Sequence, residues 1–162
     1  MRRLAIISAI LVLAWGLAVP AAARVSLDTV YNSISLEEMQ QLMAQFGYTF
    51  ETSTIGQGDP VISFRQDGYK VGLFFYHKVG DRYSAIQLSA GFSLTTPPSL
   101  GSINQWNRAK RYARAYLDQQ GDPRVELDLD LEGGATAGAI KELLRTNRVV
   151  LTQFVRHIQT VK

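Results

Sequence analysis

The residues best suited to binding chemistry lie in one stretch, INQWNRAKRYARAYLD, at positions 103–118. Aromatic and cationic side chains are interleaved there, and they are Trp106, Arg108, Lys110, Arg111, Tyr112, Arg114 and Tyr116. Grooves that bind single-stranded nucleic acid stack bases on aromatic side chains and hold phosphates with cations. Protein interfaces are enriched in Tyr, Trp and Arg as well. A third interpretation is an ordinary solvated sheet face, and the rest of the chain has to decide among the three.

The charge of the chain argues against a nucleic-acid partner. The 162 residues include 17 Lys and Arg against 14 Asp and Glu, a formal net charge of +3. Two of these cations, Arg2 and Arg3, belong to a predicted targeting segment, and removing them leaves +1 (3 minus 2). A nearly neutral domain has no strong positive field to attract a polyanion. We therefore expect no nucleic-acid partner.

Two strands are predicted around this stretch. RYARAYLD at 111–118 alternates as a strand, and RVELDLDLE at 124–132 alternates as its antiparallel partner. On the first strand Tyr112, Arg114 and Tyr116 share one face. The second strand carries an acidic row on the same outer face: Glu126, Asp128, Asp130 and Glu132. We predict that this row is solvated, that Arg114 pairs with it across the strands, and that Tyr112, Arg114 and Tyr116 form a candidate protein-binding patch.

No residue pattern indicates an enzyme or a cofactor. The acidic row could attract Ca²⁺, but alternate residues of a strand lie nearly 7 Å apart at about 3.3 Å per residue, so one ion cannot take four ligands from it. His77 and His157 are the only histidines, and neither has a metal-ligand companion four residues on. The chain has no cysteine, which excludes thiol chemistry and disulfides. We expect no catalytic residue, no metal and no cofactor.

The first 23 residues have the features of a secretory signal peptide. Arg2 and Arg3 precede an apolar run over 4–18, and Ala21 and Ala23 fit an A-x-A-like cleavage site. The apolar run is short for a spanning helix, which needs about 20 residues. We predict cleavage after Ala23, a periplasmic or secreted protein, and no stable membrane insertion after cleavage. The alternative is an uncleaved N-terminal anchor.

Residues 24–162 are predicted to form a single α+β domain. About 139 residues (162 minus 23) correspond to one domain that can bury a core. Apolar residues at helical spacing predict a helix after Ser35, with Glu38 completing a capping box and Gly47 ending it. About four antiparallel strands follow over 48–94, two of them joined by a hairpin turn at Asp67-Gly68.

The second half adds a short helix, the two strands over 111–132 and a long helix that begins at Thr136. We expect Ser102 to cap the short helix, Trp106 to fill the core, and Asn107 to fix the next turn by side-chain-to-backbone bonds. A small-ligand pocket around Trp106 is the alternative. Gly133-Gly134 is expected to be a strand-to-helix turn with unusual backbone angles. The order α-β-β-β-β-α-β-β-α predicts an antiparallel sheet of about five to six strands with helices packed on one face.

The stretch from 103 to 136 resembles the YbjN family of bacterial proteins. The resemblance rests on the residues Trp106, Asn107, Arg111, Arg114, Ala115, Tyr116, Leu117, Asp118, Gly121, Asp122, Glu126, Leu127, Asp128, Leu129, Leu131, Glu132, Gly133 and Gly134. It implies a fold similar to that of type III secretion chaperones, which are small α+β proteins, usually dimers, that hold partly unfolded client segments. The family is often labelled a sensory transduction regulator and has no settled activity. Outside the candidate patch, we interpret the shared residues as structural.

The sequence therefore predicts an exported, non-enzymatic YbjN-domain protein that binds another polypeptide or a second copy of itself, in a chaperone-like manner. The alternative is a small-ligand-binding or structural envelope domain. The two differ in what they require of the structure. A polypeptide site needs an exposed groove or face, whereas a small-ligand site needs a pocket near Trp106.

The targeting segment gives a direct prediction. Protein recovered from the cell envelope should begin at Arg24, because the positive start, the apolar run and the small residues at 21 and 23 form one cleavage signal. N-terminal sequencing of that material measures this, and a chain that still begins at Met1 would contradict it.

Overall fold

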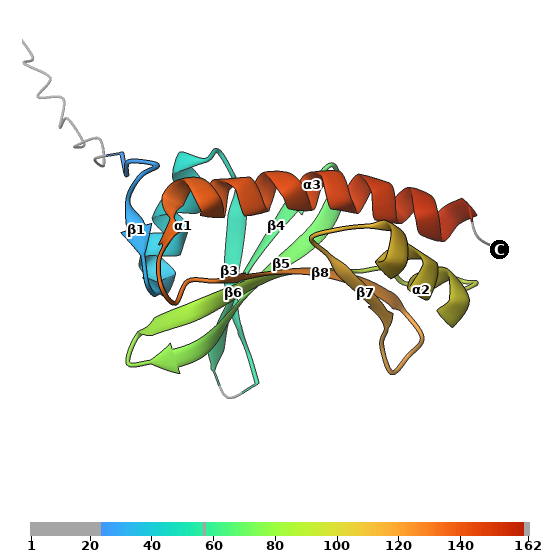
Figure 1. Ribbon diagram of the computed structural model, residues 1–162. Helices are drawn as coiled ribbons and strands as arrows, with labels where there is room; N and C mark the ends of the chain where they lie inside the picture. The colour runs from blue at the N-terminus through green and yellow to red at the C-terminus, as the bar shows by residue number, and fades with distance from the viewer. Residues whose placement is uncertain (1–23, 57, 161–162) are drawn as a thin grey trace, which may run out of the picture.

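The predicted α+β architecture is confirmed. A computed structural model describes residues 24–56 and 58–160 (Figure 1); the predicted signal segment lies outside them. The elements in chain order are β1 (Val30–Tyr31), β2 (Ile34–Ser35), α1 (Leu36–Gln45), β3 (Phe50–Ile55), β4 (Asp59–Gln66), β5 (Tyr69–Val79), β6 (Arg82–Gly91), α2 (Leu100–Ala109), β7 (Arg114–Leu117), β8 (Pro123–Asp130), β9 (Ala135–Thr136) and α3 (Ala137–Thr160). The six longer strands follow the expected order. The two-residue strands β1, β2 and β9 were not predicted, because two residues carry no periodicity.

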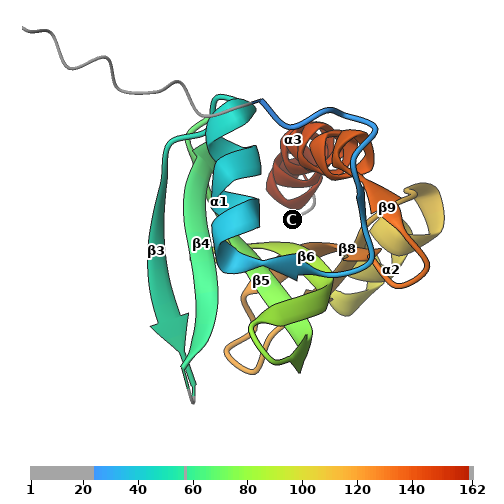
Figure 2. The same ribbon diagram turned by 90° about the vertical axis from the view of Figure 1, so that its left-hand side faces the viewer.

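In this part of the chain, seven strands form one antiparallel sheet. The order is β3-β4-β5-β6-β8-β7, and β2 pairs with the part of β6 that lies beyond β8. Strands β1 and β9 form a separate pair. The sheet curls around α3, which Figure 2 shows nearly end-on. Helices α1 and α2 lie on the same side as α3, so the other face of the sheet, called the outer face below, has no helix on it (Figure 1).

Helix α3 supplies much of the core on the helix side of the sheet. Its apolar stripe includes Ile140, Leu144, Leu151, Phe154 and Ile158, all of them buried. Helix α3 runs unbroken for 24 residues and continues through Asn147. Asn147 is buried, and its side-chain amide donates a hydrogen bond of 2.6 Å to the side-chain oxygen of Gln66. This partner removes the penalty of burying a polar side chain in mid-helix.

Two local predictions from the first half are confirmed. The Ser35 hydroxyl accepts from the backbone N–H of Glu38, and the Glu38 carboxylate accepts from the backbone N–H of Ser35, which is the expected capping box. Between β4 and β5, Asp67 and Gly68 have φ of 49° and 87°. Positive φ at both central residues is what a two-residue hairpin of type I′ requires.

The start of α2 corrects the sequence interpretation. The N-cap is Ser99, whose hydroxyl accepts from the backbone N–H of Ser102 at 3.2 Å. Ser102 is instead buried inside the first turn, where its hydroxyl and carbonyl oxygens lie 3.1 and 3.0 Å from His157 Nε2. Both serines can cap a helix, and the contact with α3 decides which of them does.

Helix α2 is tied to the sheet by two adjacent residues. Trp106 is 1% exposed, and its ring meets the ring of Phe154 edge-on at a centroid distance of 5.0 Å. The Asn107 amide donates to the carbonyl oxygen of Ala115 and accepts from its N–H, both at 2.9 Å. Because Ala115 lies in the edge strand β7, Asn107 closes the connection between α2 and that strand.

We predict that Asn107→Ala destabilises the domain by about 1–3 kcal/mol, because two hydrogen bonds to the edge-strand backbone are lost at once. Chemical denaturation followed by circular dichroism measures the change. Asn104→Ala is the matched control, since Asn104 is an exposed residue of the same helix and should change stability by less than about 0.5 kcal/mol. Equal effects of the two substitutions would contradict the assigned role of Asn107.

Candidate functional site

The structure separates the three residues of the predicted patch. Strand β7 begins at Arg114, and Arg114 and Tyr116 lie on the outer face in register with β8. Tyr112 lies before the strand with φ of +69° and is 79% exposed. The prediction of a strand over 111–118 with Tyr112 on the same face was therefore wrong. A positive φ turns the backbone out of the extended conformation, so the alternation that fits 114–117 does not extend back to Tyr112.

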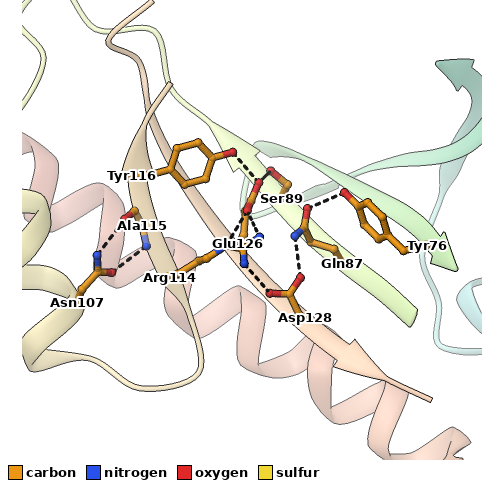
Figure 3. Close-up of polar contacts among 9 residues, drawn as sticks. All are labelled: Tyr76, Gln87, Ser89, Asn107, Arg114, Ala115, Tyr116, Glu126 and Asp128. Atoms are coloured by element: carbon orange, nitrogen blue, oxygen red, sulfur yellow. Dashed lines mark hydrogen bonds and ion pairs between the residues drawn. The ribbon is translucent and has the colours of Figure 1, made fainter. Parts of the chain in front are cut away.

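Polar side chains from four strands meet on the outer face. The pairing Arg114↔Glu126↔Ser89 forms one row across β7, β8 and β6, and Gln87↔Asp128 forms the next. Residues directly opposite on one face of an antiparallel pair lie within side-chain contact. We call the resulting group, which Figure 3 shows, the sheet-face cluster, and its members are Tyr76, Gln87, Ser89, Arg114, Tyr116, Glu126 and Asp128.

Glu126 is the centre of the sheet-face cluster and corrects the prediction of a fully solvated acidic row. It is only 7% exposed. One carboxylate oxygen accepts from Arg114 Nε and Nη2 at 3.0 and 2.8 Å, and the other accepts from the hydroxyls of Tyr116 at 2.8 Å and Ser89 at 3.2 Å. Burial of a carboxylate is tolerated because these donors replace the water that it loses. The predicted pairing of Arg114 with the acidic strand is confirmed.

A second set of bonds extends the sheet-face cluster to β5. The Gln87 amide donates to Asp128 at 2.7 Å, and the Tyr76 hydroxyl donates to the Gln87 side-chain oxygen at 3.1 Å. Asp128 also lies 3.6 Å from the Arg114 guanidinium, which joins the two sets. The side chains from Tyr76 to Tyr116 therefore form one connected network (Figure 3). Such a network fixes each member in one rotamer.

The electrostatics of the cluster keep its tyrosines neutral. Burial, followed by the negative charges of Glu126 and Asp128, raises the pKa of Tyr76. Burial, followed by the hydrogen bond to Glu126, raises the pKa of Tyr116. That same carboxylate raises the pKa of Arg114. Near neutral pH both hydroxyls therefore remain donors and Arg114 remains charged.

The rest of the acidic row is solvated, as expected. Asp128, Asp130 and Glu132 are exposed. Asp130 uses one carboxylate oxygen to accept from the backbone N–H of Glu132 at 2.8 Å. Within the residues that the structure describes, no group of three or more His, Asp or Glu side chains is arranged to hold a metal ion.

The other motif residues lie mainly in turns that shape β7 and β8. Asp118 accepts from the backbone N–H groups of Gln120 and Asp122 and from Arg124 Nε, at 2.8 to 3.0 Å. Gly121 has φ of +81° within that turn. At the far end of β8, Gly133 and Gly134 have φ of 86° and 103°, the unusual backbone angles that were expected there. Leu117 packs half-buried against the core, and Arg111 is exposed.

Sequence reasoning missed Tyr76, Gln87 and Ser89. The alternation within YSAIQLSAG places Gln87 and Ser89 opposite the apolar residues Ile86 and Leu88, which marks them as outer-face residues. Nothing local indicates that both are buried on that face. Their burial follows from neighbouring strands, which no local pattern reveals.

Comparison with known proteins places the chain in a family. The sequence profile of YbjN, described as "Putative bacterial sensory transduction regulator", matches residues 35–160. The chain belongs to the YbjN family. The match runs from the N-cap of α1 to the end of α3 and includes every member of the sheet-face cluster.

No curated protein and no solved structure matches the chain, so the likeness of this fold to secretion chaperones stays a prediction. Among the residues described, no helix is long and apolar enough to cross a membrane.

We predict that Glu126→Gln lowers the pKa of Tyr116 toward the ordinary value of about 10, because the negative charge is lost and the hydroxyl is left with at most a neutral acceptor, while burial remains. The variant should also lose about 1–3 kcal/mol of stability. Absorbance titration of each protein against its Tyr116→Phe counterpart isolates this hydroxyl. Asp130→Asn, on the same strand face, is the control and should leave the pKa of Tyr116 in place.

Proposed function

We propose that this YbjN-family domain is a non-enzymatic module that binds another polypeptide, or a second copy of itself, through the sheet-face cluster. The observation that carries the proposal is that two tyrosines are exposed and yet held in place. Tyr76 and Tyr116 are 43% and 37% exposed, yet both hydroxyls are fixed by hydrogen bonds within the cluster. The description of the family as a regulator agrees with a domain that acts by binding.

Fixed, exposed aromatic side chains lower the cost of association. A flexible side chain loses rotamer entropy of about 0.5–1.5 kcal/mol when an interface immobilises it. The hydroxyls of Tyr76 and Tyr116 are already hydrogen-bonded, so most of this rotamer entropy is lost when the domain folds and not when it binds. Tyr and Arg are also the residue types that most often dominate interface energy. The exposed guanidinium of Arg114 lies between the two rings in the network (Figure 3).

The shape of the outer face favours a polypeptide over an enclosed small ligand. A hollow of about 550 Å³ lies between Tyr76, Tyr116 and the exposed end of β8 at Asp130, and it is wide open to solvent. Small-ligand sites usually enclose most of their ligand. A polypeptide can instead lie across an open face and cover the buried polar groups beneath it.

The same contacts argue against catalysis in the sheet-face cluster. Glu126 accepts four hydrogen bonds, which leaves its carboxylate no free position from which to act as a base. Tyr76 and Tyr116 are neutral donors rather than activated nucleophiles, since their pKa values are raised. Recognition is the activity that this arrangement supports best.

We also propose that residues 1–23 direct export and are removed after Ala23. The support is the order of charge, apolar run and small residues in the sequence. The fold agrees with it at one point: the backbone N–H and C=O of Val25 bond to the Gln45 side chain, both at 2.7 Å. Val25 is therefore part of the folded domain, which agrees with a mature chain that begins at Arg24.

We predict that Tyr76→Ser weakens association with the partner by at least about tenfold while the fold is retained, because an exposed aromatic anchor is lost. A photo-crosslinking residue in place of Asp130, at the edge of the same hollow, first identifies the partner, and sedimentation equilibrium tests for self-association. Titration of the identified partner then gives the dissociation constant of each variant.

Two further variants sharpen this test. Tyr116→Phe keeps the aromatic ring and removes its hydrogen bond to Glu126. A loss of affinity in this variant measures how much the fixed position of the ring contributes to binding. Tyr112→Ser is the matched control, since Tyr112 is a more exposed tyrosine outside the cluster. Unchanged affinity in Tyr76→Ser and Tyr116→Phe, with circular dichroism showing both folded, would reject the outer face as the binding site.

A further inference from the structure

A second hollow lies on the helix side of β8. It is a groove between α3 and the connection from α2 to β7, with a volume of about 620 Å³ and one side open. Pockets that bind small ligands have volumes of about 300–1,000 Å³. The hollow is therefore large enough for a small molecule, and it lies beside Trp106, where the sequence left a ligand pocket open as an alternative.

The groove exists because the chain before β7 does not continue along β8. The pairing of β7 with β8 ends at Arg114↔Glu126, so β8 beyond Glu126 has no β7 partner. Tyr112, with its positive φ, lies in the connection that lines the groove instead. A non-glycine residue in this conformation costs on the order of 1–3 kcal/mol, and such strain is concentrated at functional sites.

The walls of the groove are apolar. Strand β8 contributes Leu127 and Leu129, and α3 contributes Ala139, Leu143 and Val150. Leu129, Ala139 and Leu143 are only half-buried, although they pack against the core. Apolar surface that stays in contact with water is what an apolar ligand part would cover, at a gain of about 25 cal/mol per Å².

The mouth of the groove carries two cations without carboxylate partners. Lys110 and Arg111 line it, and neither forms an ion pair with any residue that the structure describes. Lys110 Nζ lies 5.7 Å from the centre of the Trp106 ring. The groove therefore offers positive charge at its rim beside an apolar interior.

Both carboxylates that also line the groove have partners other than Lys110 and Arg111. Glu142 pairs with Arg145 at 2.6 Å. Asp128 lies 3.6 Å from Arg114 and accepts from Gln87. The lining thus carries three cations, Lys110, Arg111 and Arg145, against two carboxylates, which is a net charge of +1 (3 minus 2).

The indole of Trp106, a residue that lines the groove, carries an unpaired donor. Its Nε1–H is buried and has no hydrogen-bond acceptor among the described residues. A buried donor left unpaired costs about 1–3 kcal/mol, and such groups call for an explanation. Trp106 lines the groove, but its Nε1 atom is buried and is therefore not exposed to a ligand there.

We propose that this groove binds a small amphiphilic carboxylate, with its apolar part over Leu129, Leu143 and Val150 and its carboxylate between Lys110 and Arg111. Apolar walls alone would accept any hydrophobic molecule. The two unpaired cations select an anionic head group, since a desolvated opposite charge strengthens each hydrogen bond made to it. The groove lies on the helix side of β8, and Asp128 is the one member of the sheet-face cluster that also lines it.

The test is a titration with three ligands that share one tail: decanoate, decanol and decylamine, all below their micelle concentrations. The protein is the full chain carrying Trp15→Phe, so that Trp106 is its only tryptophan. Decanoate should change the Trp106 fluorescence saturably and bind at least about tenfold tighter than decanol. Decylamine should bind most weakly, because its charge has the same sign as that of Lys110 and Arg111.

Two variants in the same background separate the contribution of the ligand's head group to binding from that of its tail. Lys110→Gln combined with Arg111→Gln should weaken decanoate about tenfold or more and leave decanol unchanged. Ala139→Leu narrows the groove with a good helix-forming residue and should weaken both ligands. The charge-matched control is Arg108→Gln with Arg156→Gln, two exposed cations that do not line the groove, and it should change neither affinity.

The apolar residues 4–18 are common to all these proteins, so differences between variants report the groove alone. The proposal is overturned if decanoate produces no saturable change, or if it binds all variants and decanol equally well, which would mean adventitious association. Tyr76→Ser should leave decanoate affinity unchanged. A failure of polypeptide binding at the sheet-face cluster can therefore be told apart from a failure of this site.

Discussion

The fold depends on burying the apolar stripe of α3 inside the curl of one sheet. Ile140, Leu144, Leu151 and Phe154 face the strands, and α1 and α2 close the same side (Figures 1 and 2). Apolar burial is the dominant favourable contribution to folding, and here it is directed to one face. No helix of residues 24–56 and 58–160 covers the outer face, so its side chains satisfy one another or remain in water.

The buried carboxylate of Glu126 is the clearest consequence. An ionised group without water is stable only when it is paired and hydrogen-bonded, and Arg114, Tyr116 and Ser89 supply the bonds. These contacts hold the side chains in place at the surface. The hydrogen bonds that the buried carboxylate requires for folding therefore also hold aromatic and charged side chains in place at the surface. Side chains that are fixed before binding lower the entropy cost of recognition.

Strand β8 connects the two sites because its two faces differ in character. Leu127 and Leu129 point to the helix side and form part of the groove, whereas Glu126 points to the outer face. Asp128, near the end of the paired region, lines both hollows. It also bonds to Gln87 and lies close to Arg114, which are both members of the sheet-face cluster. Strand β8 is thus the element that both sites share.

The sequence by itself determined the features that depend on neighbours a few residues away. The capping box of Ser35 and Glu38, the hairpin at Asp67-Gly68 and the alternation of β8 all follow from local geometry. Their periods and turn chemistry are set by backbone sterics, which act over about four residues. The family likewise follows from the order and spacing of residues, which the match over 35–160 confirms.

Only the tertiary structure decided which polar residues are buried and where strands end. Glu126 looks like any other member of the acidic row, and it is buried because Ser89, 37 residues away, and Tyr116, 10 residues away, reach the same point. In the sequence Ser102 resembles an N-cap, but in the structure its hydroxyl contacts the ring of His157, 55 residues away. Tyr112 continues the alternation of its strand in the sequence, but the backbone leaves β8 before reaching it. Burial and pairing depend on elements brought together by folding, and these contacts leave no trace in the local pattern of residues.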